Sequence, residues 1–140
     1  MAQLTNQVKS KQRVKDFAEV FTGEREVKAM CDLIPIEVWE NIESTFLEPA
    51  CGTGNFLVEI LARKYKRCKT EEDGLKALKS ITAIDIQEDN CAECRAMLLE
   101  QFVLSFPDAA EETKDEAENI LQRNVICGNS LEIMAKWAGG

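Results

Sequence analysis

The segment 47–57, Leu-Glu-Pro-Ala-Cys-Gly-Thr-Gly-Asn-Phe-Leu, constrains this chain more than any other part of its sequence. The residues that lead into it, Thr45 to Leu47, are β-branched and apolar, as in a short buried strand. From Asn55 onward, apolar residues recur at helical spacing. Gly52 and Gly54 lie between the two patterns, and glycine lets the backbone approach a ligand closely. The segment therefore predicts a strand, a glycine loop and a helix whose first N–H groups point toward a bound ligand.

Two residues of this segment indicate the class of ligand. A dinucleotide-binding fingerprint requires a third glycine, and Leu57 stands in its place. A carboxylate at Glu48 would repel a pyrophosphate, but it suits a cationic or hydroxyl-bearing ligand. The run Glu-Pro-Ala-Cys-Gly-Thr-Gly-Asn-Phe-Leu resembles motif I of methyltransferases that use S-adenosyl-L-methionine (AdoMet), and most closely the adenine-specific (amino-group) DNA methyltransferases of restriction–modification systems. The resemblance implies an α/β fold of the Rossmann-like class I methyltransferase type.

Composition excludes several other classes of protein. The chain has 140 residues, of which 45% are hydrophobic, which is enough for one domain with a core. A net charge of −8 argues against a stand-alone nucleic-acid binder, because phosphate contacts need lysine and arginine. The absence of histidine excludes histidine-based catalysis and histidine metal sites. Without a membrane-length apolar run or a secretion signal, we expect a cytoplasmic protein whose six cysteines are reduced.

The chain before the glycine loop predicts two segments. Residues 1–16 are basic and form either a flexible, solvated N-terminus or an arm that contacts phosphates; both interpretations stay open. Residues 17–140 form the expected AdoMet-binding domain. An amphipathic helix is predicted after Thr22 and ends at Pro35, with Val27, Met30, Cys31 and Ile34 on its apolar face. One more helical turn follows over 36–41, with Trp39 as its core anchor.

The residues just before this helix, 17–23, resemble motif X of the same methyltransferases, in which a Phe-Thr segment covers the methionine end of AdoMet. The resemblance implies contacts from Phe21 and Thr22. The family commonly continues with Thr-Pro-Pro, whereas this chain has Thr-Gly-Glu.

A second strand is predicted over 81–86, because a nearly continuous apolar run is typical of a parallel strand covered on both faces. It carries Asp85 at its end, where a carboxylate can accept both hydroxyls of a ribose. This stretch resembles motif II and implies ribose contacts from Asp85 and Ile86. A third strand over 125–127 is followed by Asn129 and Ser130, in the position of motif III, which contacts the adenine of AdoMet.

The remaining segments are predicted mainly as packing or solvated elements. The helix over 88–106 has Cys91, Cys94, Leu98 and Phe102 on one face; no second Cys-x-x-Cys completes a zinc site, so we expect core packing. The basic residues at 63, 64, 66 and 67 are interpreted as a solvated helix end, which the helix dipole favours. A loop with a short helix is expected over 68–79, an exposed loop and helix over 107–123, and a short helix over 130–137.

One motif of the family is missing. Amino-methyltransferases carry Asp/Asn-Pro-Pro-Tyr/Phe/Trp as motif IV, which holds the target amine and stacks on the flipped base. The three prolines of this chain are isolated, at 35, 49 and 107, and no target-recognition region follows. We therefore expect the AdoMet-binding part of a longer enzyme, or a truncated gene product, with three parallel strands and flanking helices. The parent enzyme would transfer a methyl group from AdoMet to the exocyclic amine of adenine and contact DNA through its missing part.

The cofactor contacts that the resemblance implies share one property: none is a catalytic acid, base or metal ligand. They are Phe21, Thr22, Glu48, Pro49, Ala50, Cys51, Gly52, Gly54, Asn55, Phe56, Asp85, Ile86, Asn129 and Ser130. Three alternatives stay open: a methyltransferase acting on RNA, protein or a small molecule; a non-catalytic AdoMet-binding module; and a dinucleotide-binding oxidoreductase domain.

A last expectation concerns the edge of the sheet. The family's strand order, 3-2-1-4-5, would leave the outer edge of the first strand open here. We expect that edge to be covered by self-association or by the terminal helix near Trp137.

Overall fold

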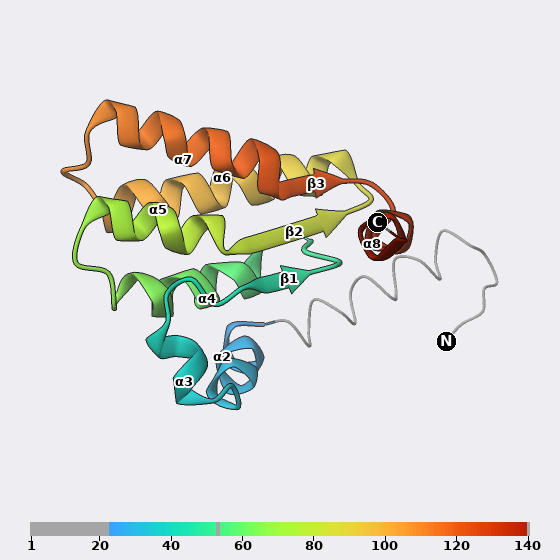
Figure 1. Ribbon diagram of the computed structural model, residues 1–140, viewed down its shortest axis with the longest axis horizontal. Helices are drawn as coiled ribbons and strands as arrows, with labels where there is room; N and C mark the ends of the chain where they lie inside the picture. Colours follow the sequence, from blue (N-terminus) through green and yellow to red (C-terminus); the bar gives the residue numbers. More distant parts are fainter. Residues whose placement is uncertain (1–22, 53, 140) are drawn as a thin grey trace.

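A computed structural model describes residues 23–52 and 54–139 of the chain. It is a mixed α/β structure in which helices flank a small parallel sheet (Figure 1). In chain order the elements are α2 Glu24–Asp32, α3 Ile36–Glu40, β1 Phe46–Glu48, α4 Asn55–Tyr65, α5 Glu71–Lys79, β2 Ile81–Asp85, α6 Glu88–Ser105, α7 Glu111–Asn124, β3 Val125–Cys127 and α8 Ser130–Gly139.

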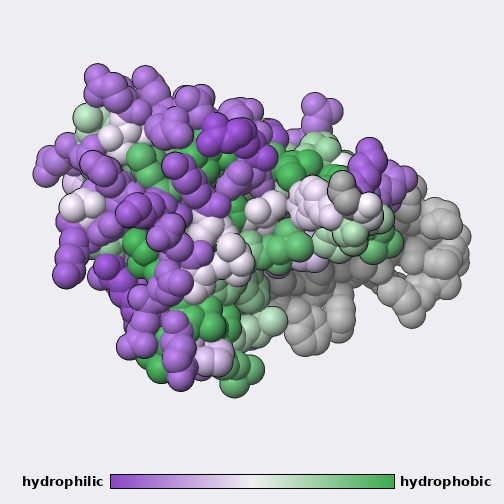
Figure 2. Space-filling view, viewed as in Figure 1, coloured by the Kyte–Doolittle hydropathy of each residue, from purple (hydrophilic) through white to green (hydrophobic). Residues whose placement is uncertain are grey.

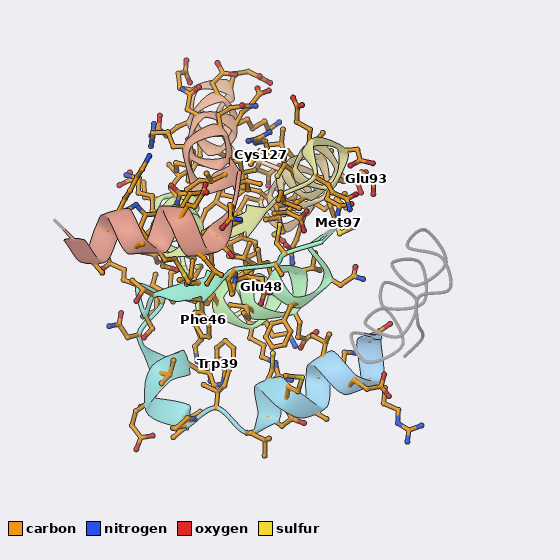
Figure 3. All side chains as sticks on the ribbon, turned by 90° about the vertical axis from the view of Figure 1, so that its right-hand side faces the viewer. Trp39, Phe46, Glu48, Glu93, Met97 and Cys127 are labelled. Atoms are coloured by element: carbon orange, nitrogen blue, oxygen red, sulfur yellow. The ribbon has the colours of Figure 1, made fainter. Side chains whose placement is uncertain are left out.

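The sheet has three strands in the order β1-β2-β3, and both pairs are parallel. Phe46 pairs with Ile81, and Ala83 pairs with Val125. All three predicted strands are confirmed, within a residue of their expected bounds. Because parallel strands point the same way, their carboxyl ends meet at one edge of the sheet, which faces the reader in Figure 3. The small parallel sheet agrees with the expected α/β class.

The core lies between the sheet and the helices α4 to α7. Cys91, Cys94, Leu98 and Phe102, the predicted apolar face of α6, all have an exposed fraction of 0%, so their assignment to core packing is confirmed. Tyr65 and Phe106 extend this core, with ring centroids 5.2 Å apart at a steep interplanar angle. Such edge-to-face contacts are the arrangement that aromatic rings prefer.

Helix α5 is longer than its polar sequence suggested, and α7, which was expected as part of an exposed loop and helix, buries Ala117, Ile120 and Leu121. The expected short helix within 68–79 is the nine-residue α5, and its N-cap Thr70 accepts a hydrogen bond from the backbone N–H of Asp73 at 3.1 Å. Three acidic residues in its first turn and two lysines in its last turn suit the helix dipole. Figure 2 shows hydrophilic residues over most of α5 and α7, so these helices bury only narrow apolar faces.

Helices α2 and α3 lie below β1 in Figure 1. Trp39 is only 4% exposed and stacks on Phe46 with 5.5 Å between ring centroids, which confirms its role as an anchor. Val27 and Cys31 are buried as predicted, but Met30 is 49% exposed. Spacing alone placed Met30 on the apolar face, whereas α2 buries only Val27 and Cys31; Ile34, beyond the end of the helix, is partly buried against the core.

The boundaries of α2 also differ from the prediction. The helix ends at Asp32, and Pro35 is the N-cap of α3. Gly23 occupies the N-cap of α2, and the predicted cap, Thr22, lies outside the described residues.

The prediction that the basic end of α4 is solvated is wrong for Lys64, which has an exposed fraction of 0%. Its ammonium donates hydrogen bonds to the carbonyl of Ile42 at 2.9 Å, to the hydroxyl of Ser80 at 2.8 Å and to the carbonyl of Ser44. It also lies 5.0 Å from the centroid of the Phe46 ring. One buried lysine thus joins α4 to the segments that enter β1 and β2.

Arg63 is likewise not a free surface charge. Its guanidinium forms ion pairs with Asp32 at 2.9 Å and Glu59 at 2.8 Å, and lies 5.5 Å from the centroid of the Trp39 ring. A tertiary neighbour on α2 therefore orders this side chain, so the dipole of α4 alone does not explain its position.

Helix α8 lies beside the carboxyl ends of the strands, where it is seen end-on in Figure 1 and from its side in Figure 3. None of its described residues is buried, and Trp137 is 52% exposed. Trp137 therefore does not form the packed contact that we expected against β1. Among the described residues, β1 has a strand partner on one side only.

No helix within residues 23–52 and 54–139 is both long enough and apolar enough to cross a membrane.

Candidate functional site

The candidate site is the glycine loop between β1 and α4, at the carboxyl edge of the sheet. The backbone N–H of Cys51 donates to the carbonyl of Ile84 at 2.8 Å, so the loop stays attached to β2 after β1 ends. The N–H of Gly54 then donates to the carbonyl of Cys51 at 2.9 Å and closes a tight turn. Helix α4 begins directly afterwards, at Asn55. The loop thus places the positive end of a helix dipole at the strand ends, as predicted.

The two glycines have different physical roles. Gly52 has φ +56° and Gly54 has φ +97°, a region that residues with a side chain rarely adopt. A Cβ on Gly54 would lie 3.1 Å from the sulfur of Cys94, whereas a Cβ on Gly52 would meet no atom within 4 Å. Gly54 therefore permits α6 to pack against the loop. Only Gly52 offers the open backbone that we predicted for both.

Asp85, at the end of β2, accepts three hydrogen bonds from groups at this edge of the sheet. Its Oδ2 accepts a hydrogen bond from the N–H of Gly52 at 2.9 Å. Its Oδ1 accepts from the N–H of Gln87 at 2.9 Å and from the side-chain amide of Asn90 at 3.2 Å. A carboxylate has about four acceptor positions, so three donors leave about one for a ligand.

Glu48 is the second carboxylate beside the loop, at the end of β1. Its Oε1 accepts a weak hydrogen bond from the N–H of Ala50 at 3.3 Å. Burial raises the pKa of Glu48 above its ordinary value, and the hydrogen bond from Ala50 partly opposes this shift. Within 23–52 and 54–139, Glu48 forms no ion pair. A half-buried carboxylate without a cationic partner would be stabilised by a positively charged ligand group.

The third strand adds Asn129 to the same edge. The N–H of Gly128 donates to the backbone carbonyl of Asp85 at 2.9 Å and fixes the loop after β3 against the end of β2. The Oδ1 of Asn129 accepts from the N–H of Glu132 at 3.1 Å, so Asn129 caps α8. Ser130 is the first residue of that helix.

The other predicted residues divide into exposed and inward-packed groups. Pro49, Ala50 and Asn55 are exposed, and Ile86 is 68% exposed beside Asp85. Phe56 is partly buried against the hydrophobic core and Cys51 is 7% exposed, so both side chains are packed mainly inward.

Phe21 and Thr22, the predicted motif X contacts, lie outside the described residues. Sequence reasoning missed Gln87 and Asn90, although their position directly after β2 is a signal that could have indicated them.

A separate cleft of about 720 Å³ lies between α2, α3 and α4, away from the glycine loop. Two of its charges already have partners, because Arg63 pairs with Asp32 and Glu59, and Lys28 pairs with Glu24. No cluster in the described ranges has the geometry of a metal site. The edge that carries Glu48, Gly52 and Asp85 therefore remains the best candidate for ligand binding.

This edge can hold a ligand by accepting hydrogen bonds and by balancing positive charge. Two carboxylates from adjacent strands accept hydrogen bonds from the loop backbone, Glu48 from Ala50 and Asp85 from Gly52, and the exposed Ile86 provides an apolar neighbour. Comparisons with protein-family models, with curated proteins and with solved structures found no match to this chain.

Proposed function

We propose that this chain binds AdoMet, as the cofactor-binding part of a DNA methyltransferase that modifies the exocyclic amine of adenine. The observation that carries the proposal is the pair of carboxylates at the glycine loop. Glu48 accepts from Ala50 and Asp85 accepts from Gly52, so both acids flank one short stretch of backbone. Such a pair suits a ligand that carries both positive charge and vicinal hydroxyls, and AdoMet has both.

The chemistry of these groups fits the cofactor. The ammonium and sulfonium of AdoMet would compensate the half-buried charge of Glu48, whose pKa is raised by burial. One ribose hydroxyl would donate to the acceptor position of Asp85 that Gly52, Gln87 and Asn90 leave free. Ile86 offers an apolar surface for the adenine, and Asn129 offers an amide edge.

When bound, AdoMet would supply the electrophilic methyl group of the reaction. The residues of this chain would bind and orient it. These 140 residues contain no Asp/Asn-Pro-Pro-Tyr/Phe/Trp motif, so the proposal assigns to them the binding of the cofactor alone.

Calorimetric titration with AdoMet and with its demethylated product, S-adenosylhomocysteine, tests the proposal. Replacing Asp85 by Asn should weaken binding of both ligands by roughly 5- to 150-fold, because a ribose hydroxyl loses its charged acceptor at about 1–3 kcal/mol. Asp89→Asn is the matched control, since Asp89 is an exposed acid in the first turn of α6. Circular dichroism of each variant checks that the fold is retained. Equal affinities of the wild type and Asp85→Asn would contradict the assignment.

The variant Glu48→Gln gives a second and independent readout. AdoMet carries a positively charged sulfonium, whereas the sulfur of S-adenosylhomocysteine is uncharged. Glu48→Gln should therefore lose more affinity for AdoMet than for S-adenosylhomocysteine. Titration with NADH discriminates the oxidoreductase alternative. Binding of NADH in place of AdoMet would overturn the proposal.

The proposal also predicts that these 140 residues transfer no methyl group to DNA by themselves, because no group is present to hold a target amine. Radiolabelled AdoMet and mixed-sequence DNA provide the assay. Label found in the DNA would show that the division of function proposed here is wrong.

A further inference from the structure

The cleft between α2, α3 and α4 has a charge opposite to that of the chain as a whole. It lies away from the glycine loop and has a volume of about 720 Å³. Four cations and two acids line it, so its local net charge is +2, whereas the whole chain carries −8. These charged residues are Lys28, Asp32, Glu59, Arg63, Lys66 and Arg67. The proposed binding of AdoMet uses none of them, so the cleft calls for a separate explanation.

Two of the four cations in the cleft have no acidic partner in the part of the chain that the structure describes. Lys28 and Arg63 form ion pairs with acids on α2 and α4. Lys66 and Arg67, at the C-terminal end of α4, are exposed and form no such pair. Exposed cations at one site attract carboxylates of a partner and orient it as it docks.

Apolar side chains accompany these charges. Among the residues that line the cleft, Cys31 and Trp39 are buried, Ile34 is partly buried and Ile36 is 55% exposed. Leu33, between α2 and α3, is 83% exposed. In Figure 2, hydrophobic residues over α2 and α3 reach the surface among hydrophilic ones. Exposed apolar side chains that gather beside a cleft are typical of an interaction surface.

The same cleft is poorly suited to a nucleic acid. The ring of Trp39 already has two neighbours, Phe46 and the guanidinium of Arg63, each 5.5 Å from it. It is only 4% exposed, so it offers no platform on which a base could stack. Two unpaired cations are also few for a phosphate backbone, which the overall charge of −8 repels. An apolar surface beside the cations suits the side chains of a polypeptide better.

We propose that this cleft is a docking site for an acidic amphipathic segment of a partner protein. Carboxylates of the segment would pair with Lys66 and Arg67, and its apolar side chains would cover Ile34 and Ile36. The exposed Leu33 extends the apolar surface beyond the cleft, which favours a polypeptide over a small amphipathic anion. The proposal goes beyond cofactor binding and does not depend on it, because the cleft and the glycine loop share no residue.

Fluorescence anisotropy with three labelled peptides of equal length tests the docking chemistry. The first peptide combines glutamate and leucine at helical spacing, the second replaces each leucine by serine, and the third replaces each glutamate by lysine. The first should bind saturably and lose affinity as salt rises, whereas the other two should bind roughly 10-fold more weakly or worse. No binding of the first peptide, or equal binding of the second, would overturn the proposal. Tighter binding of a labelled DNA duplex would overturn it as well.

Charge-reversal variants test whether the peptide binds at the cleft. Lys66→Glu combined with Arg67→Glu should weaken binding of the first peptide by roughly 10-fold or more. The matched control, Lys76→Glu combined with Lys79→Glu, reverses two exposed charges in the last turn of α5 and should have little effect. Ile36→Ser should weaken binding by roughly 5-fold, because it removes apolar contact. Circular dichroism checks that each variant is folded, and equal losses in the two charge-reversal variants would contradict the assignment.

Nuclear magnetic resonance of the isotope-labelled chain locates the contact directly. The first peptide should shift the amide signals of α2, α3 and the last turn of α4, while those of the glycine loop stay in place. The same shifts on raising the protein concentration without peptide would identify a second copy as the occupant and would overturn the proposal. AdoMet enters none of these measurements, so failure here is distinct from failure of the proposed function.

Discussion

Replacing Lys64 by methionine tests whether a buried ammonium holds the entrances to two strands in place. Methionine keeps the length and apolar stem of lysine but removes every N–H donor. Three acceptors then lose their partner: the carbonyls of Ile42 and Ser44 and the hydroxyl of Ser80. The unfolded chain hydrates all of these groups, so the substitution changes mainly the free energy of the folded state.

Two effects of opposite sign decide the magnitude. Three charge-assisted hydrogen bonds at about 1.5 kcal/mol each contribute about 4–5 kcal/mol. Against this, burial lowers the pKa of Lys64 from its ordinary value of 10.5 to about 8. Each pKa unit corresponds to about 1.4 kcal/mol, so holding the charge inside costs about 3 kcal/mol at pH 7. Lys64→Met should therefore destabilise the protein by only about 1–2 kcal/mol at neutral pH.

The pH dependence separates the two effects. Between the folded pKa of about 8 and the unfolded value of 10.5, the unfolded chain binds more protons at Lys64 than the folded chain. The contribution of Lys64 to the free energy of unfolding therefore rises with pH in this window. From pH 7 to pH 10, the wild type should gain about 2–2.5 kcal/mol relative to Lys64→Met.

Urea denaturation followed by circular dichroism at both pH values measures this difference. Titration of Tyr65 and of the other buried thiols is common to both proteins and cancels in the comparison, except at Cys68, whose pKa burial raises and the charge of Lys64 partly lowers. Lys66→Met is the control, because Lys66 is the exposed C-cap residue of the same helix and its substitution should change stability little at either pH. A difference between wild type and Lys64→Met that stays constant or shrinks toward pH 10 would refute the reasoning about burial.

Three other predictions follow from single contacts. Gly52→Ala should lower the free energy of unfolding by about 1 kcal/mol, because the residue has a positive φ. Gly54→Ala should lower it by about 2–3 kcal/mol, because its added methyl group would also press against Cys94. Equal losses measured by urea denaturation would contradict this difference. Tyr65→Phe should stabilise the protein by about 1 kcal/mol in thermal unfolding, since the buried hydroxyl has no hydrogen-bond partner in the described chain; a lower midpoint would indicate that the hydroxyl is paired. Light scattering should show concentration-dependent self-association through the outer edge of β1, whose N–H and C=O groups have no strand partner among the described residues; a monomer at high concentration with freely exchanging β1 amides would exclude it.

Local sequence patterns predicted the elements whose signals are local. The apolar runs of β2 and β3, the glycines before α4 and the helical spacing of Cys94, Leu98 and Phe102 each depend on neighbours within a few residues. The length of the polar helix α5 and the burial of the polar helix α7 were underestimated, because helices that bury a narrow apolar face resemble loops in composition.

Features that depend on distant parts of the chain could not be predicted in this way. The burial of Lys64 arises from the segments that enter β1 and β2, and no pattern within α4 records them. For the candidate site, the proximity of Glu48 and Asp85 was predictable, since parallel strands bring their carboxyl ends together. The three internal donors to Asp85 and the packing of Gly54 on Cys94 required the tertiary structure.

The strand order β1-β2-β3 has a consequence for how the chain assembles during synthesis. Each strand pairs with the next one in the sequence, so the sheet can grow in the direction in which the chain leaves the ribosome. The first strand pair and the bond from Gly52 to Asp85 need nothing beyond the end of β2. We expect the glycine loop to be held by Asp85 before α7 and β3 have been synthesised, with the later elements added onto a loop that already has its final shape.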